Sequence, residues 1–312
     1  MHVFVTGGSG LTGPAVVSEL IAAGHVVTGL ARSDKAELRL HGLGARVIRG
    51  ALEDVEPLRA GAERADAVLH MAFGGDFADP DDLIRRDRSA IEALGGALVG
   101  SGKPFVSTSG TLVMTPARVS TENDPADTSS IGAFRIPGEA ACLGFATRGV
   151  RSSVVRLAPT VHGPHDIGFI PMLVATALRT GVSAYIGDGS NRWPAVHRLD
   201  AATLFRLALE KAPAGTVWHG AAESGVTLKS IAEMIGDKLR LPVRSVSAAE
   251  APGHFGNPFF ARVFGIDAPV SSERTRAELG WKPSHATLLD DLAHGDYFTE
   301  AAYSAFAGSR HS

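Results

Sequence analysis

The sequence predicts an α/β protein whose core is a doubly wound parallel sheet, followed by a smaller C-terminal part. Strand-like and helix-like segments alternate through the first half of the chain. A glycine-rich turn separates the first strand from the first helix, and from Gly163 onward shorter elements are separated by glycine and proline. Such alternation places helices on both faces of a parallel sheet.

The first thirteen residues combine a strand, a turn and the start of a helix. Residues 2–5 form an apolar run, and residues 11–20 carry apolar side chains at helical spacing. Gly7 lets the chain turn out of the strand, Gly10 leaves the backbone open to a pyrophosphate, and Gly13 lets the helix pack closely. Because a helix N-terminus offers free N–H groups to phosphate, we expect a dinucleotide to be bound by this turn, at Gly7, Gly10, Leu11, Thr12 and Gly13.

The remaining elements of the first half follow in a regular order. Further strands are expected at 25–31, 45–48, 66–71, 104–108 and 151–157, and helices at 35–43, 81–99 and 133–147.

Composition narrows the class of protein. The chain has 312 residues, 45% hydrophobic and 20% charged, with a formal net charge of −3. This balance gives no reason to expect nucleic acid or membrane as a partner, and no apolar run approaches the roughly 18–20 residues of a membrane span. A strand beginning at residue 2 leaves no room for a signal peptide, and the single cysteine, Cys142, excludes an intramolecular disulfide. We expect a cytoplasmic protein that acts on a small molecule and holds no metal.

Two motifs carry a family resemblance. The segment T-G-G-S-G-L-T-G at 6–13 resembles the T-G-x-x-G-x-x-G fingerprint of the extended short-chain dehydrogenase/reductases, which include NAD-dependent epimerases and dehydratases. The run at 271–283, ending L-G-W-K-P, resembles another segment of that branch. The resemblance implies a Rossmann-type domain over 1–163, to which 196–220 and about 263–312 partly return. It also implies a small substrate-binding domain over 164–195 and 221–262, and a possible homodimer through the helices at 81–99 and 133–147.

The end of the second strand bears on the choice of cofactor. A carboxylate there would bind the ribose 2′-hydroxyl of NAD, whereas this chain has Arg32 followed by Ser33. A guanidinium and a hydroxyl suit a 2′-phosphate, so NADP(H) is favoured over NAD(H), although Asp34 stands nearby. The resemblance adds further cofactor contacts at Asp54, Met71, Ala72, Phe73, Thr108, Pro159, Thr160 and Val161.

The catalytic segment departs from the pattern that the resemblance implies. Relatives use a Ser or Thr after the fifth strand and Tyr-x-x-x-Lys on the next helix. Here S-T-S-G-T at 107–111 resembles S-S-S-A-T, with Ser109 as the first choice for a substrate contact and Thr108 and Thr111 as second choices. Alignment on the glutamate at 139 puts Arg135 at the lysine position and Ile131 at the tyrosine position. Arg135 is expected to hold the ribose, while the usual proton donor is missing.

Three residues outside this segment are candidates for substrate contact. Arg192 and Trp193 lie in a loop that faces the cleft in relatives, and a cation beside an indole can grip an aromatic or anionic molecule. His254 lies in a glycine-containing loop of the small domain. The alternative for Trp193 is plain core packing. Loops such as 76–82 and 252–260 are expected to shape the pocket.

These observations support an NAD(P)-dependent oxidoreductase, with an NADPH-dependent reductase of a small carbonyl, enone or imine as the first hypothesis. A nucleotide-sugar epimerase or dehydratase is an alternative, although relatives of that type usually prefer NAD and use the missing tyrosine. A protein that senses NADP(H) without turnover is a third hypothesis, which Ile131 favours.

Overall fold

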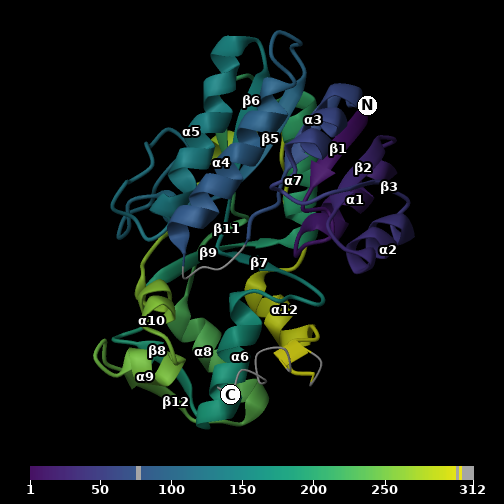
Figure 1. The fold of residues 1–312 in the computed structure, drawn as a ribbon. Coiled ribbons are helices and arrows are strands. Elements are labelled where there is room, and N and C mark those ends of the chain that lie inside the picture. The colour runs from purple at the N-terminus through teal and green to yellow at the C-terminus, as the bar shows by residue number, and fades with distance from the viewer. Residues whose placement is uncertain (75–78, 300–301, 304–312) are drawn as a thin grey trace.

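The computed structural model describes residues 1–74, 79–299 and 302–303. Figure 1 shows a sheet flanked by helices, with a smaller group of elements from the second half of the chain at one end. The sheet has seven strands in the order β10-β6-β5-β4-β1-β2-β3. All of its pairings are parallel. The strands are β1 His2–Thr6, β2 Val26–Ala31, β3 Arg46–Arg49, β4 Ala67–His70, β5 Pro104–Gly110, β6 Arg151–Leu157 and β10 Thr216–Gly220.

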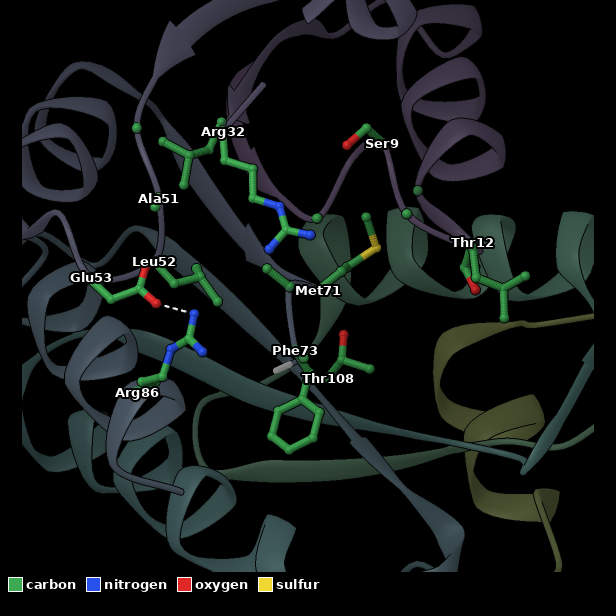
Figure 2. Close-up of a pocket in the computed structure, with 18 of the residues that line it drawn as sticks. Ser9, Thr12, Arg32, Ala51, Leu52, Glu53, Met71, Phe73, Arg86 and Thr108 are labelled. Carbon is green, nitrogen blue, oxygen red and sulfur yellow. Dashed lines mark ion pairs between the residues drawn. The ribbon is translucent and has the colours of Figure 1, made fainter. Parts of the chain in front are cut away.

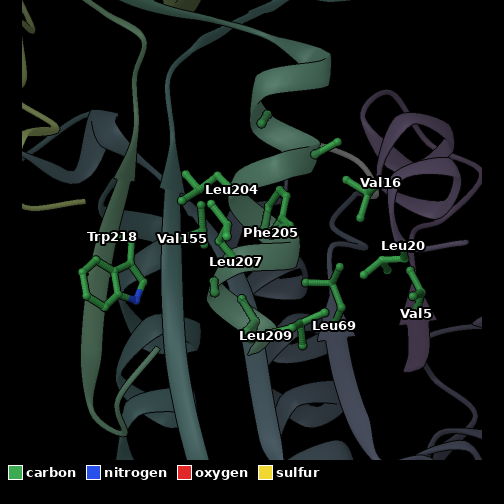
Figure 3. Packing of buried hydrophobic residues seen from close by; sticks show 14 of the residues in the cluster. Val5, Val16, Leu20, Leu69, Val155, Leu204, Phe205, Leu207, Leu209 and Trp218 are labelled. Atoms are coloured by element: carbon green, nitrogen blue, oxygen red, sulfur yellow. The ribbon is translucent and has the colours of Figure 1, made fainter. Parts of the chain in front are cut away.

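Helices cover both faces of this sheet, because successive strand residues point to opposite sides. Val3 and Val5 belong to one core cluster and Phe4 to another. The first cluster includes residues of α1 Gly13–Ala22, α2 Asp34–Gly42 and α7 Arg198–Lys211, and the second includes residues of α3 Val55–Arg64, α4 Pro80–Gly96 and α5 Ile136–Gly144. Figure 3 shows the apolar side of α7, with Leu204 and Phe205, packed on the sheet near α1. The doubly wound α/β prediction is therefore confirmed.

The sheet order defines where a ligand can bind. From β1 the chain continues to β2 and β3 on one side, and then crosses to β4 and β5 on the other. In an open parallel sheet this reversal leaves a crevice at the carboxyl ends of the strands.

A second group of elements has its own apolar core, which includes Ile170, Ile231, Phe264 and Leu292. It contains a three-stranded sheet, β11-β9-β7, and a two-stranded sheet, β12-β8. The strands are β7 Thr160–His162, β8 Ser183–Ile186, β9 Arg192–His197, β11 Glu223–Thr227 and β12 Val243–Val246. The helices are α6 Phe169–Thr180, α8 Leu228–Leu239, α9 Ala251–Phe255, α10 Pro258–Gly265 and α12 Leu288–His294, whereas α11 Glu273–Leu279 contacts β10 of the main sheet.

Two differences from the expected elements have local causes. The helix predicted at 133–147 is divided into a 3₁₀ turn at Ala133–Arg135, the α-helix α5 and a second 3₁₀ turn at Phe145–Arg148. Pro137 lies in the first turn of α5, where its missing N–H costs nothing. The helix α3 was not predicted at all. Within the described residues, no helix is both long and apolar enough to cross a bilayer.

Candidate functional site

A cavity of about 390 Å³ opens at the crevice between the two halves of the sheet. Figure 2 shows it with Arg32 near its centre, Thr12 on one side and the Glu53–Arg86 ion pair on the other. Ten of the residues predicted to bind a cofactor line it: Gly7, Gly10, Leu11, Thr12, Gly13, Arg32, Met71, Ala72, Phe73 and Thr108. Ten others complete the lining: Ser9, Leu30, Gly50, Ala51, Leu52, Glu53, Gly74, Arg86, Leu157 and Phe205.

The glycine turn leaves no room for a side chain at Gly7 or Gly13. Gly7 has a φ of 74°, and a Cβ there would lie 2.5 Å from the backbone nitrogen of Ala72. A Cβ on Gly13 would lie 2.3 Å from the carbonyl oxygen of Gly7. The Thr12 side chain makes no capping hydrogen bond to α1, so N–H groups of the first helical turn remain for an anion.

Charge is unevenly distributed at the end of the cavity that follows β2 and β3. Arg32 lines the cavity, while Asp34 pairs with Arg49 at 3.0 Å. The carboxylate of Glu53 forms an ion pair with Arg86, whose side chain reaches the cavity from α4. Asp34 and Glu53 therefore each have a cation other than Arg32 as a partner.

Two predicted cofactor contacts are structural in this fold. The Ser33 hydroxyl accepts a hydrogen bond from the Ala36 N–H at 3.3 Å and caps α2. The Asp54 carboxylate accepts from the Ala51 N–H at 2.8 Å and closes the turn before α3. Neither lines the cavity; Glu53, the neighbour of Asp54, does. Glu53 stands beside Asp54 after the third strand, a region that contacts the cofactor by the family resemblance, whereas no sequence pattern indicated Arg86.

Arg135 reaches the wall of the cavity without lining it. Its guanidinium carbon lies 3.6 Å from the centre of the Phe73 ring, and the guanidinium donates a hydrogen bond to the carbonyl oxygen of Thr108. Nη1 lies 3.8 Å from Oδ1 of Asp87. Burial lowers the pKa of the Arg135 guanidinium, and the carboxylates of Asp87 and Glu139 act in the opposite direction. The lysine position of relatives is thus held by a buried, fixed cation.

The hydroxyl groups after β5 are buried. Ser109 and Thr111 are 5% and 0% exposed, and their oxygens and that of Thr108 have no hydrogen-bond partner among the described residues. A hydroxyl in this state can bind a polar ligand atom that enters the site. Ile131, at the tyrosine position, packs against the apolar core of the small group of elements, and no tyrosine lines the cavity in the described structure.

The three predicted cofactor contacts at 159–161 follow β6. Thr160 and Val161 lie on β7 and are buried, and the Thr160 hydroxyl has no partner among the described residues. Pro159 is half-buried. None of the three lines the cavity, whereas Leu157 at the end of β6 does.

The three predicted substrate contacts are dispersed. Trp193 is fully buried, with its ring stacked on Phe264, which agrees with core packing, the alternative to a substrate contact. Arg192 pairs with Asp267 at 2.9 Å. His254 lies on α9 beside a separate small pocket that shares no residue with the cavity. Of the loop 76–82, residues 76–78 lie outside the described residues.

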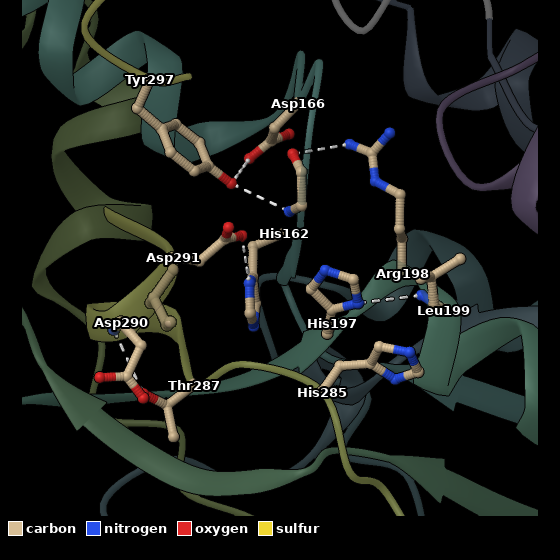
Figure 4. Close-up of polar contacts among 12 residues, drawn as sticks. His162, Asp166, His197, Arg198, Leu199, His285, Thr287, Asp290, Asp291 and Tyr297 are labelled. Carbon is tan, nitrogen blue, oxygen red and sulfur yellow. Dashed lines mark hydrogen bonds and ion pairs between the residues drawn. The ribbon is translucent and has the colours of Figure 1, made fainter. Parts of the chain in front are cut away.

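A cluster of polar side chains stands where β7, α7 and the C-terminal segment meet (Figure 4). The His197 ring accepts a hydrogen bond from the Leu199 N–H at 3.3 Å and caps α7. Burial lowers the pKa of His197 to about 4. Tyr297 accepts from the Gly163 N–H at 3.0 Å and donates to Asp166 at 3.2 Å; burial raises the pKa of Asp166 to about 6.

The glycine turn, the crevice and the lined cavity define a Rossmann-type nucleotide-binding protein. Residues 3–219 match the NAD dependent epimerase/dehydratase family. The chain therefore belongs to this family, which binds a nicotinamide cofactor, and the resemblance to the extended short-chain dehydrogenase/reductases is confirmed.

The chain has relatives along nearly its whole length. An uncharacterized protein of Schizosaccharomyces pombe is 46% identical over 299 residues, covering 96% of this chain and 100% of that protein. A 4-hydroxy-2-methyl-3-oxo-4-farnesyl-3,4-dihydroquinoline-1-oxide ketoreductase of Stigmatella aurantiaca is 26% identical over 321 residues, covering 94% and 96%. The crystal structure of DesIV, a dTDP-glucose 4,6-dehydratase of Streptomyces venezuelae with NAD and TYD bound, superposes with a TM-score of 0.76 at 22% identity, covering 94% and 95%.

Proposed function

We propose that this protein is an NADP(H)-dependent oxidoreductase that reduces a small carbonyl, enone or imine. The observation that carries the proposal is the charge arrangement after β2. Arg32 lines the cavity, and Asp34 and Glu53 are each paired with another arginine. A guanidinium at this position favours a 2′-phosphate through charge-assisted hydrogen bonds. The ketoreductase relative supports a reductase.

Each part of the site has a role in this proposal. The glycine turn and the N-terminus of α1 hold the diphosphate, and Arg135 holds hydroxyl groups of the nicotinamide ribose. Ser109 donates a hydrogen bond to the substrate oxygen. The nicotinamide supplies the hydride when it is bound. Because arginine is a poor proton donor near neutral pH, a substrate with a modest need for a proton from the enzyme, such as an enone or an iminium ion, suits this site.

Two other functions have specific support. The fold shared with DesIV supports a nucleotide-sugar dehydratase or epimerase, but isoleucine replaces the tyrosine that such relatives use. A protein that binds NADP(H) without turnover is supported by the same Ile131, whose side chain packs into an apolar core.

The test is a fluorescence titration of the protein with NADPH and, separately, with NADH. We expect tighter binding of NADPH, and we expect Arg32→Asp to weaken NADPH binding roughly ten- to a hundredfold, as charge-assisted contacts to the phosphate are lost. Arg59→Asp makes the same charge change at an exposed position of α3 outside the cavity lining, so it is the matched control.

The titration separates the three functions. A preference for NADH would overturn the role of Arg32 and favour the epimerase or dehydratase. Binding of neither cofactor would remove every redox function. NADPH binding without turnover of any carbonyl, enone or imine would leave the sensing protein.

A further inference from the structure

Asp87 is a buried carboxylate for which the proposed function gives no role. It lies on α4, is 5% exposed, and directs Oδ1 toward two partners. Nε2 of His70 lies at 3.2 Å and Nη1 of Arg135 at 3.8 Å. Oδ2 occupies the space beside Gly138, where a Cβ would approach it to 2.2 Å. The absence of a side chain at Gly138 therefore makes room for this carboxylate against α5.

The hydrogen bonds behind Asp87 fix the orientation of His70. A carboxylate only accepts, so Nε2 of His70 carries the proton and donates to Asp87. Nδ1 of His70 lies 2.7 Å from the hydroxyl oxygen of Thr6, which also receives the Ala72 N–H at 3.4 Å. The hydroxyl of Thr6 and the carboxylate of Asp87 therefore hold the His70 ring from its two nitrogens, and the same carboxylate oxygen also faces Arg135.

The guanidinium of Arg135 is held by groups of three kinds. It stacks on the Phe73 ring, donates to the Thr108 carbonyl and faces the Asp87 carboxylate. Its buried Nη1 has no hydrogen-bond partner among the described residues, which leaves an N–H for a ligand atom. Both Phe73 and Thr108 line the cavity.

Arg135 stands beside one half of the cavity only. Phe73 follows β4 and Thr108 lies on β5, whereas Arg32 follows β2 on the other side of β1. In a crevice of this kind the residue after β2 faces the adenosine ribose. The other half of a dinucleotide, which carries the nicotinamide, therefore lies over β4 and β5, next to Arg135.

We propose that Asp87 is a positioning residue, oriented by His70, that fixes Arg135 against Phe73 and Thr108 for binding the nicotinamide half of the cofactor. This inference rests on the proposed function. It assigns a role to an interaction between α4 and the turn before α5, and that role is specific to one half of the ligand.

The test measures binding of three probes to the full-length protein: NADPH, reduced nicotinamide mononucleotide, and adenosine 2′,5′-bisphosphate. We expect Asp87→Asn to weaken the binding of NADPH and of the mononucleotide about tenfold or more, because the charge that orients Arg135 is lost. Binding of adenosine 2′,5′-bisphosphate should stay unchanged. Asp291→Asn is the matched control, since Asp291 is also buried and accepts from a histidine, His162, at 2.9 Å, but forms no ion pair with Arg135 in the described structure.

A double-mutant cycle tests whether Asp87 acts on ligand binding through Arg135. Once Arg135→Gln is present, Asp87→Asn should have little further effect on mononucleotide affinity, because the guanidinium that Asp87 positions is gone. If the two substitutions weaken mononucleotide binding independently, so that their effects multiply, the proposal is overturned. An equal loss of affinity for adenosine 2′,5′-bisphosphate would overturn it as well. If Asp87→Asn does not fold, Arg135→Gln decides alone: unchanged mononucleotide binding overturns the proposal.

The same data separate this inference from the proposed function. A wild-type protein that binds neither NADPH nor adenosine 2′,5′-bisphosphate would overturn both. Normal NADPH binding that Asp87→Asn leaves unchanged would overturn only the role of Asp87.

Discussion

The guanidinium of Arg156 and the carboxylate of Glu139 form a buried two-point ion pair that joins β6 to α5. Nε of Arg156 donates to Oε2 at 3.0 Å, and Nη2 donates to Oε1. The two side chains are 4% and 6% exposed. Both groups are buried, and apart from a contact of Arg156 Nη1 with Met114 Sδ at 3.0 Å, each takes its side-chain hydrogen bonds from the other in the described structure.

Removing one partner of this pair should therefore be costly. Glu139→Ala leaves a buried guanidinium without a counter-charge, and we expect the free energy of unfolding to fall by about 3–5 kcal/mol. Urea denaturation measures the loss. Glu278→Ala, which breaks the more exposed pair with Arg274, should cost less than about 1 kcal/mol; similar losses in the two variants would contradict the argument.

The close packing of the glycine turn predicts the effect of one methyl group. Gly13→Ala would place its Cβ 2.3 Å from the Gly7 carbonyl oxygen, so the turn must shift. We expect a stability loss of about 1–3 kcal/mol and at least a tenfold loss of NADPH affinity. Gly42→Ala is the control, because nothing lies within 4 Å of its added Cβ. Normal NADPH binding by Gly13→Ala would show that the turn does not hold the phosphates.

The proposed role of Ser109 predicts a selective loss of turnover. Ser109→Ala removes a buried hydroxyl that has no hydrogen-bond partner among the described residues, so folding and NADPH affinity should change little. With a substrate found by screening, kcat should fall about a hundredfold if the hydroxyl stabilises the reacting oxygen. An unchanged kcat would place the substrate oxygen elsewhere in the site.

The buried His197 predicts a dependence of stability on pH. Its pKa is about 4 in the fold against 6.5 for the ordinary value, so between these values the unfolded chain binds more protons. Stability is therefore lost as the pH falls from about 7 toward 4, by up to about 3 kcal/mol. Asp166, with its pKa raised to about 6, acts in the opposite direction, because its contribution is lost as the pH rises through 6.

Comparing unfolding at pH 7 and pH 5 isolates the histidine. In His197→Asn the loss of stability between the two pH values should be smaller than in the wild type. His41→Asn, at an exposed histidine of α2, should leave it unchanged. An equal pH effect in wild type and His197→Asn would assign it to other groups.

Local sequence patterns predicted those strands and helices whose residue types match their packing in the fold. The strand at 151–157 was predicted with the bounds that β6 has. The helix α3 was missed because Pro57 and Gly61 interrupt its pattern. The structure explains Gly61: a Cβ there would lie 2.4 Å from the ring of Phe4 on β1.

Most of the cofactor wall was predictable because its residues directly follow strands. The remainder depends on contacts between distant segments. No local pattern indicates that Arg135 faces Asp87, or that Arg86 reaches Glu53. Trp193 had two interpretations for a related reason: an aromatic residue near a cleft and one in a core have the same local sequence, and only the stacking on Phe264 decides between them.

The hydrogen bond between Tyr297 and Gly163 also affects the order in which parts of the fold can form during synthesis. It joins positions 134 residues apart, and the loop that it anchors reaches the glycine turn, because a Cβ on Gly168 would lie 3.9 Å from Leu11. A chain emerging from the ribosome can pair its first six sheet strands long before Tyr297 is synthesised. The wall beside Leu11 can therefore be fastened only after Tyr297 has been synthesised, later than the pairing of those six strands.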